Sequence, residues 1–394
     1  MNAPPIARLK PYQGLAFLSY GFRPFFFLGA AYAAIAISVW LPVYLDETAL
    51  STVFAPRDWH VHEMLFGYLS AAVTGFLLTA IPNWTGRLPL QGAPLLFLMA
   101  AWVAGRIAIL LSAHFGWLLA ALIDCAFLIL VTGAAAREIF AGNNWRNLKI
   151  LFPLSVLSLT NVAFHIEAHL SGIAAFSTRA GIGALLMLIM LIGGRIIPSF
   201  THNWLTRMNP GRMPVSFGKF DAVVIAVSAV ALLLWIVLLD GLAVGAALFA
   251  AGALQFIRLS RWAGDRTVAE PLVIILHIGY AFVPVGFLLT ALAAISIVQP
   301  SAGLHAWMAG AAGTLTLAVM TRATLGHTGQ KLLASRGTQA IYAAVVIATV
   351  ARIMAALIPS SWDALVYVAA LAWIGAFGGF AALYAPLLFR PRRI

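Results

Sequence analysis

The stretch WHVHEMLFGYLSAAVTGFLLTAI, residues 59–81, determines the fold class of the chain. Beyond Glu63 it carries no charged residue, and as a helix it is long enough to cross a bilayer core, which needs about 20 residues. Similar stretches recur from end to end in a sequence that is 62% hydrophobic and only 9% charged. Soluble domains carry about 25% charged residues. The sequence therefore predicts an all-α integral membrane protein.

The apolar stretches predict twelve transmembrane helices in a single polytopic domain covering residues 1–394. The expected spans are 24–44, 59–81, 93–112, 116–138, 149–170, 175–200, 220–240, 242–259, 271–298, 302–323, 338–358 and 364–388.

The positive charge of the chain follows the expected topology. The net charge is +12, but the Lys and Arg residues sit in short loops between spans, so the lipid bilayer is the expected partner and nucleic acid is not. With both termini in the cytoplasm, Arg57 and Arg179 are the only Lys or Arg residues in the outer loops. The first residues, MNAPPIARLKPYQG, are too polar for a cleaved signal sequence, so we expect the first span to direct insertion.

Spans two, six and ten align with one another in one register. This register pairs His62 with His305, and Gly67 with Gly183 and Gly310. It also pairs IPNWT (81–85) with IPSFT (197–201) and TLGHT (324–328), and Thr79 with Arg195 and Arg322. The alignment predicts three pseudo-repeats of four helices. Such an arrangement resembles that of the catalytic subunit of heme-copper oxidases, a likeness of fold that does not establish function.

Histidines gather at two expected depths, and the outer layer is the stronger candidate for a metal site. It comprises His60 and His62 in span two, His165 and His169 in span five, and His305 in span ten. Because His165 and His169 are four residues apart, they should share one helical face and chelate a metal. We expect His62 and His305 to clamp a heme from both faces. Alternatively, each histidine simply reaches the aqueous rim, and Glu63 either orients a histidine, carries protons or faces water.

The inner layer contains His202, His277 and His327, from three different spans. They could form a three-nitrogen copper site or ligate another heme, and the sequence does not choose between these. Arg195, Arg322 and Arg23 are candidates for binding heme propionates, because guanidinium binds carboxylates in bidentate fashion. Snorkelling to the interface is the alternative for Arg195 and Arg322, and a positive-inside anchor is the alternative for Arg23.

The motifs GFRPFF (21–26), WHVHEMLFGY (59–68), GFLLTAIPNWTGR (75–87) and GGRIIPSFTHNW (193–204) resemble those of the NnrS family. The likeness extends over the whole chain in length and span count. It implies a multi-pass protein of the bacterial inner membrane that is linked to denitrification and nitrosative stress, with heme of the b type and copper as cofactors. It does not assign ligands to either cofactor.

Three functions are compatible with these observations. The first is a heme and copper protein that binds or turns over nitric oxide. The sequence does not decide whether such a protein is an oxidoreductase. The second is a membrane transporter or metal-handling protein, for which polar groups in spans mark a permeation path. The third is a heme electron-transfer protein with an unidentified electron donor. A Soret band that shifts with nitric oxide indicates the first, an unshifted band the third, and colourless protein the second.

Overall fold

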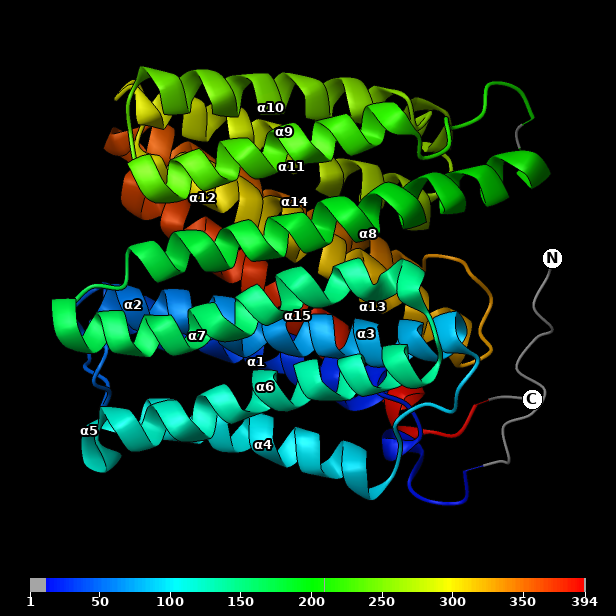
Figure 1. The fold of residues 1–394 in the computed structure, drawn as a ribbon, viewed down its shortest axis with the longest axis horizontal. Helices are drawn as coiled ribbons and strands as arrows, with labels where there is room; N and C mark the ends of the chain where they lie inside the picture. Colours follow the sequence, from blue (N-terminus) through cyan, green and yellow to red (C-terminus); the bar gives the residue numbers. More distant parts are fainter. Residues whose placement is uncertain (1–11, 209, 393–394) are drawn as a thin grey trace.

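A computed structural model describes residues 12–208 and 210–392, and every regular element in these ranges is helical (Figure 1). Twelve of the described segments are long and apolar enough to cross a membrane. The predicted all-α membrane fold and its twelve spans are therefore confirmed. Of the N-terminal stretch MNAPPIARLKPYQG, residues 1–11 lie outside the described residues.

The elements follow one another as η1 (Ala16–Leu18), α1 (Phe22–Tyr44), α2 (Pro56–His62), η2 (Glu63–Tyr68), α3 (Leu69–Thr85), α4 (Ala93–Leu110), α5 (Ser112–Phe115), α6 (Trp117–Ala141), η3 (Trp145–Ile150), α7 (Leu151–Ser171), α8 (Phe176–Met208), α9 (Lys219–Leu238), α10 (Leu242–Ser260), η4 (Gly264–Thr267), α11 (Pro271–Ala294), α12 (Pro300–His305), η5 (Ala306–Gly313), α13 (Thr314–His327), α14 (Arg336–Leu357), η6 (Pro359–Ser361) and α15 (Trp362–Phe389). Elements α2, η2 and α3 together make the second span, and α12, η5 and α13 make the tenth.

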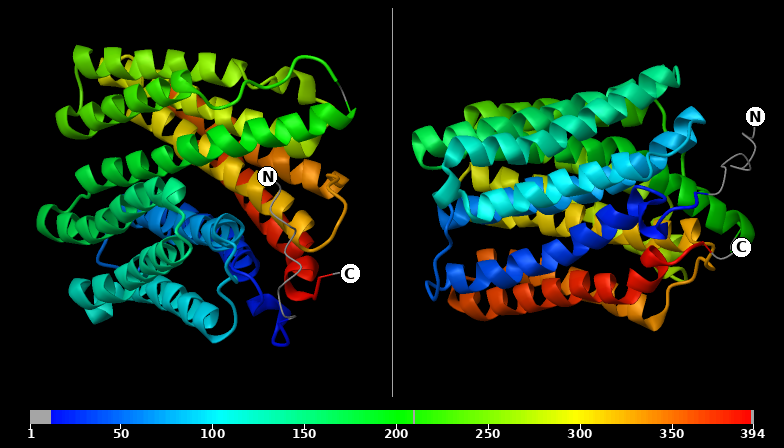
Figure 2. Two further views of the ribbon diagram at one scale, coloured as in Figure 1. Left: turned by 45° about the vertical axis from the view of Figure 1, so that its right-hand side comes forward. Right: turned by 90° about the horizontal axis from the view of Figure 1, so that it is seen from below.

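The second and tenth spans lie deeper in the bundle than the spans around them. In their most apolar stretches 78% and 67% of the residues are buried, against 39% for α4, α6, α9 and α10. Figure 1 places α10 at one edge of the bundle and α4 at the other, and Figure 2 shows the same helices from two further sides. Polar side chains on the second and tenth spans therefore face protein more than lipid.

The second and tenth spans share a local irregularity. Each contains a π-helical segment, η2 or η5, which begins directly after His62 or His305, the two residues that the repeat register aligns. A π-helical segment adds a residue to the turn, and such segments occur often at functional sites. The sixth span, α8, is α-helical throughout. The threefold repeat and the oxidase-like arrangement stay predictions.

The described chain starts and finishes at the same end of the bundle, as an even number of spans requires (Figure 1). Spans two and ten begin at the opposite end, where α2 and α12 both start with a proline in the first turn. A proline is well tolerated there because the first turn needs no backbone N–H donor. His60, His62 and His305 therefore lie close to the helix starts at that opposite end.

Candidate metal centre and cavity

Among the residues that the structure describes, one group of three side chains has the composition and spacing of a metal site. His62 of α2, Asp124 of α6 and His165 of α7 each offer a ligand atom, and these atoms lie within 4.8 Å of one another. The three side chains are buried, with residue exposures of 0%, 2% and 2%. We call this group the His–Asp–His cluster.

The Asp124 carboxylate is the centre of the cluster. Its Oδ2 atom lies 3.2 Å from Nε2 of His62 and 3.1 Å from Nε2 of His165. The same oxygen accepts a hydrogen bond of 2.8 Å from Nδ2 of Asn161, which lies one helical turn before His165 on α7. Asn161 and His165, one turn apart on α7, thus both face Asp124.

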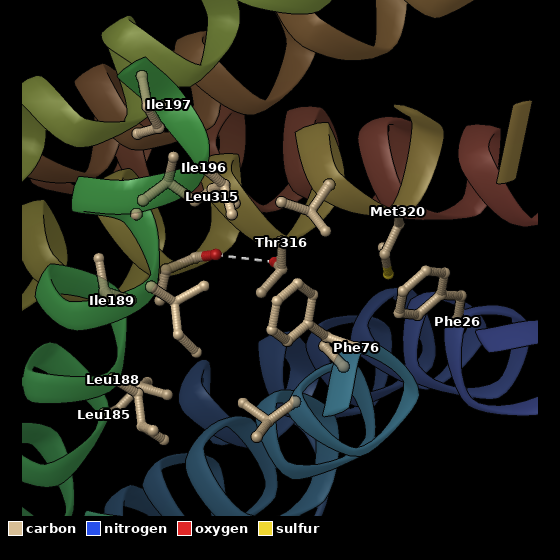
Figure 3. A pocket seen from close by; sticks show the side chains of 16 residues that line it. Phe26, Phe76, Leu185, Leu188, Ile189, Ile196, Ile197, Leu315, Thr316 and Met320 are labelled. Carbon is tan, nitrogen blue, oxygen red and sulfur yellow. Dashed lines mark hydrogen bonds between the residues drawn. The ribbon is translucent and has the colours of Figure 1, made fainter. Parts of the chain in front are cut away.

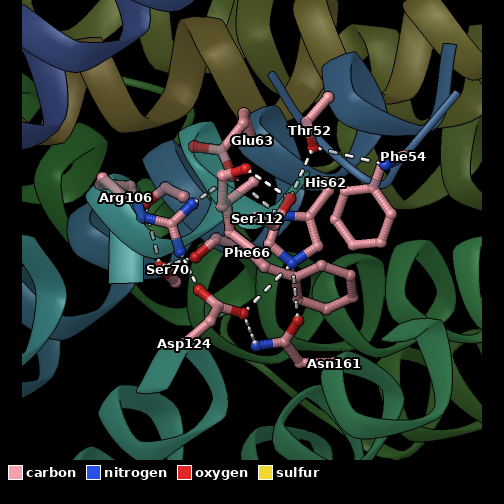
Figure 4. A network of polar contacts seen from close by, with 12 residues as sticks. Thr52, Phe54, His62, Glu63, Phe66, Ser70, Arg106, Ser112, Asp124 and Asn161 are labelled. Atoms are coloured by element: carbon pink, nitrogen blue, oxygen red, sulfur yellow. Dashed lines mark hydrogen bonds and ion pairs between the residues drawn. The ribbon is translucent and has the colours of Figure 1, made fainter. Parts of the chain in front are cut away.

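A second set of groups holds the cluster in place (Figure 4). Oε1 of Glu63 lies 2.8 Å from Nδ1 of His62. Arg106 of α4 donates to the same Glu63 oxygen at 2.5 Å and, through its other terminal nitrogen, to Asp124. The hydroxyl of Tyr32 donates to the second oxygen of Glu63. These contacts fix the ring of His62, which is what an orienting role for Glu63 requires.

The contacts of His62 leave a place for one more positive charge. Because Glu63 is an acceptor, Nδ1 of His62 donates to it, and neutral imidazole then has a lone pair on Nε2. That lone pair faces two further acceptors, Oδ1 of Asn161 at 3.1 Å and Oδ2 of Asp124. Two carboxylates also share the single guanidinium of Arg106. Either a second proton on His62 or a bound metal ion would supply the missing positive charge.

The donor set of the cluster fits a transition metal. Two imidazole nitrogens and one carboxylate oxygen suit Cu(II), and the same set also binds non-heme Fe(II). Metal-ligating histidines usually have a partner on the other ring nitrogen, as His62 has in Glu63. Nδ1 of His165 is buried and has no such partner among the described residues. The donor set and the Glu63 partner of His62 fit a bound ion.

On the other side of α2 a cavity of about 530 Å³ lies between the second and tenth spans. His60 and His305 both line it, with Met64 of η2 and Met308 of η5 beside them. Most of the remaining lining is apolar or aromatic and comes from α1, α8, α14 and α15. Cofactor pockets commonly measure about 300–1,000 Å³ and are mainly apolar with a few polar groups. We call this space the histidine cavity.

Two features of the histidine cavity suit a flat cofactor that carries carboxylates. Arg352 of α14 lines it, and its guanidinium lies over the Trp362 ring, with 4.8 Å between Cζ and the ring centroid. Its NH1 atom is buried and has no hydrogen-bond partner among the described residues. A buried N–H donor without a partner is unfavourable unless an acceptor meets it. The Trp40 ring packs against His60 with centroids 4.3 Å apart, which holds that imidazole in place. Two imidazoles, a guanidinium and apolar walls fit heme.

Two pairings expected from the sequence are replaced by others. His62 does not line the histidine cavity, and His60 lies there with His305 instead. The reason is that His60 and His62, two residues apart, face different sides of α2. His169 is exposed and stacks on Trp117 at 4.2 Å, while His165 points inward. Trp117 thus holds His169 at the surface, away from the position that chelation with His165 requires.

The three histidines of the inner layer lie apart from one another. His202 is exposed on α8. Nε2 of His277 lies 2.8 Å from the Thr201 hydroxyl, and its buried Nδ1 has no hydrogen-bond partner in the described part of the chain. The ring of His327 packs against Phe22 at 5.4 Å. The structure therefore forms no shared metal site from these three residues.

The three arginines proposed for propionates have other contacts. Arg23 donates to the carbonyl groups of Leu388 and Arg390 at 2.8 and 2.7 Å, so it caps the end of α15. Arg195 reaches Asn147 at 3.4 Å. The guanidinium of Arg322 lies 4.2 Å from the centroid of the Phe200 ring. None of the three lines the histidine cavity.

Sequence reasoning missed Asp124, Arg106 and Arg352. All three are charged residues inside otherwise apolar spans, and such residues are rare unless they have a functional or structural partner. That rarity was the available signal. The partners could not be read from the sequence, because Asp124 and Arg106 lie in spans without a distinctive motif.

Replacing Arg106 by alanine is expected to lower the free energy of unfolding by about 3–5 kcal/mol, because two buried carboxylates lose their counter-charge. Unfolding of purified protein in mixed detergent micelles measures the change. Arg87→Ala is the matched control, since its pair with Glu138 is exposed and is worth at most about 1 kcal/mol. Equal destabilisation by both substitutions would show that the buried network does not depend on Arg106.

A family model described as NnrS protein matches residues 16–392, which is nearly the whole chain. No curated protein matches the chain.

Proposed function

The chain belongs to the NnrS family, and we propose that it binds copper and a b-type heme inside the membrane and binds or turns over nitric oxide there. The observation that carries this proposal is the pair of buried sites on one helix. His62 faces a cluster that lacks one positive charge. His60 faces a cavity that contains a second imidazole and the guanidinium of Arg352, whose buried NH1 atom has no hydrogen-bond partner among the described residues.

The His–Asp–His cluster is the proposed copper site. His62, His165 and Asp124 would hold the ion, and copper bound there supplies a centre that exchanges one electron. Around it, Glu63 keeps Nδ1 of His62 protonated, so that Nε2 offers its lone pair to the site. Arg106 and Asn161 hold the carboxylate of Asp124 in position. The burial of these groups keeps bulk water away from the site.

The histidine cavity is the proposed heme site. His60 and His305 would ligate the iron, Arg352 would pair with a propionate, and heme bound there supplies an iron centre that takes up diatomic gases. Arg57 and Asp46 also line the cavity and are exposed, so the polar edge of a cofactor would lie toward the aqueous rim. Trp40 orients the ring of His60.

Electron transfer by heme is the second candidate function, and one observation favours it. Two histidines line the same cavity, and if both held the iron, the heme would supply electron transfer and leave no place for a gas. Both imidazoles are held in the cavity. Nδ1 of His305 bonds the carbonyl oxygen of Ser301 at 2.7 Å, and the Trp40 ring packs against His60.

We place the protein in the bacterial inner membrane with both termini in the cytoplasm. The twelve apolar helices and the distribution of Lys and Arg between loops support this placement. In this orientation both proposed sites lie near the outer surface, so an electron donor would act from that side or through the bundle.

Spectra of the purified full-length protein test the proposal. We expect a Soret band whose position shifts when nitric oxide is added to the reduced protein, together with copper by elemental analysis. A Soret band that does not shift supports electron transfer instead. Protein that contains neither heme nor copper after expression with both supplied contradicts the proposal.

A further inference from the structure

A second, smaller cavity lies between α3, α8 and α13 (Figure 3). It measures about 90 Å³, and α3, α8 and α13 provide most of its sixteen lining residues, with Phe26 of α1 among the others. Nine of the sixteen are buried and the other seven are partly exposed, so the space is partly open. We call this space the central chamber.

The walls of the central chamber offer nothing to bind water. Fifteen of its sixteen lining residues are apolar side chains or glycine, and Thr316 is the exception. The Thr316 hydroxyl bonds the carbonyl of Ala312 at 2.7 Å and lies 2.5 Å from the hydroxyl of Tyr68. A buried water needs two to four polar partners, whereas an apolar cavity of about 150 Å³ in another protein stays dry and binds xenon. The central chamber is therefore suited to a small apolar occupant.

The central chamber and the histidine cavity lie one after the other along the same three helix faces. In the second span the lining passes from Leu69 of the cavity to Ala72 of the chamber, and in α8 it passes from Ile182 to Leu185. In the tenth span it passes from Ala309 to Ala312. Each step is about one helical turn, so only one layer of side chains separates the two spaces.

A hydrogen-bonded pair of hydroxyl groups marks this separating layer. The side chain of Tyr68 lines the histidine cavity, while its partner Thr316 lines the central chamber. A rotation of the Tyr68 ring would break one hydrogen bond and move the side chain that stands between the two spaces. Tyr68 is fully buried, and its ring packs edge-on against Trp373 and Phe377, so its rotation also requires these two rings to shift.

We propose that the central chamber binds a small apolar gas molecule and delivers it to the histidine cavity past Tyr68. The occupant is a diatomic gas, because the volume holds a few atoms and the walls lack charges and free hydrogen-bonding groups. Such a gas partitions into lipid and can reach the chamber without crossing water. Delivery to the cavity rests on the proposed function, whereas occupancy of the chamber does not.

Xenon tests occupancy of the chamber. Crystals of the full-length protein pressurised with xenon are expected to show an anomalous peak in the chamber. That peak should be lost in Ala72→Phe and in Ile189→Trp, each of which places a larger side chain in the space. Leu371→Phe is the control, because Leu371 is 64% exposed on α15, and it should retain the peak. Water or lipid density in the chamber, or xenon bound only elsewhere, overturns the proposal.

The kinetics of nitric oxide binding test delivery. In heme-loaded protein, Ala72→Phe should slow the association rate without changing heme content, and Tyr68→Phe should raise it because the hydroxyl pair is lost. An unchanged association rate in both variants overturns delivery. If the protein proves to hold no heme, the xenon experiment still decides whether the chamber takes a gas, so the two failures remain distinct.

Discussion

Protein with His165→Ala is expected to bind copper at least roughly 100-fold more weakly than wild type. Loss of a residue that merely supports a ligand already weakens metal binding by about 10–100-fold, and loss of a ligand should do more. The remaining His62 and Asp124 cannot fill the coordination shell, because Asn161 offers only an amide oxygen at 3.1 Å from His62. Copper retained per protein after dialysis against a graded series of chelators measures the effect.

His169→Ala is the matched control for this experiment. His169 lies one turn from His165 on α7, but it is exposed and stacks on Trp117. Its removal should leave copper affinity unchanged, and both variants should keep the heme spectrum because neither residue lines the histidine cavity. Equal copper affinity in His165→Ala and wild type would remove the His–Asp–His cluster as the metal site. If the protein contains iron in excess of its heme and no copper, the His–Asp–His cluster remains the metal site but its metal is iron.

Protein with His305→Ala is expected to lose most of its heme, with a fall in the Soret absorbance per protein, because one of two imidazoles in the histidine cavity is removed. The copper content should not change, because His305 is no part of the His–Asp–His cluster. The pyridine hemochrome assay and elemental analysis on the same sample measure both quantities. His165→Ala should therefore lower only the copper content, and His305→Ala only the heme content.

His327→Ala is the control for the heme experiment. His327 is in the same span at the other end, where its ring packs against Tyr20 and Phe22. Its loss should leave heme content unchanged. Heme loss in His327→Ala with full retention in His305→Ala would move the heme site to the inner layer and contradict the placement argued from the cavity. Adding imidazole to His305→Ala should partly restore the spectrum if the lost ligand is the cause.

The sequence was sufficient to predict the twelve spans, because a run of about 20 apolar residues has few alternatives in a chain with so little charge. It was also sufficient to select as candidates the histidines at the starts of the second and tenth spans and His165 in α7. These predictions depend on the spacing of residues along one helix, which can be read directly from the sequence.

The pairing of these histidines could not be predicted, because it depends on how one helix is rotated against another. His60 and His62 could exchange roles with a small rotation of α2, and the π-helical turn that follows changes the direction of the residues beyond it. Arg352 and Asp124 become site residues only through packing. Their spans carry apolar faces that would fit many neighbours equally well.

We propose that one helix, α2, serves two separate buried sites through His62 and His60. Anomalous diffraction from crystals of the cofactor-loaded protein, recorded at the copper and iron edges, tests this arrangement. We expect a copper peak within bonding distance of His62, His165 and Asp124, and an iron peak in the cavity between His60 and His305. Copper among His202, His277 and His327, or both metals in one cavity, would contradict it.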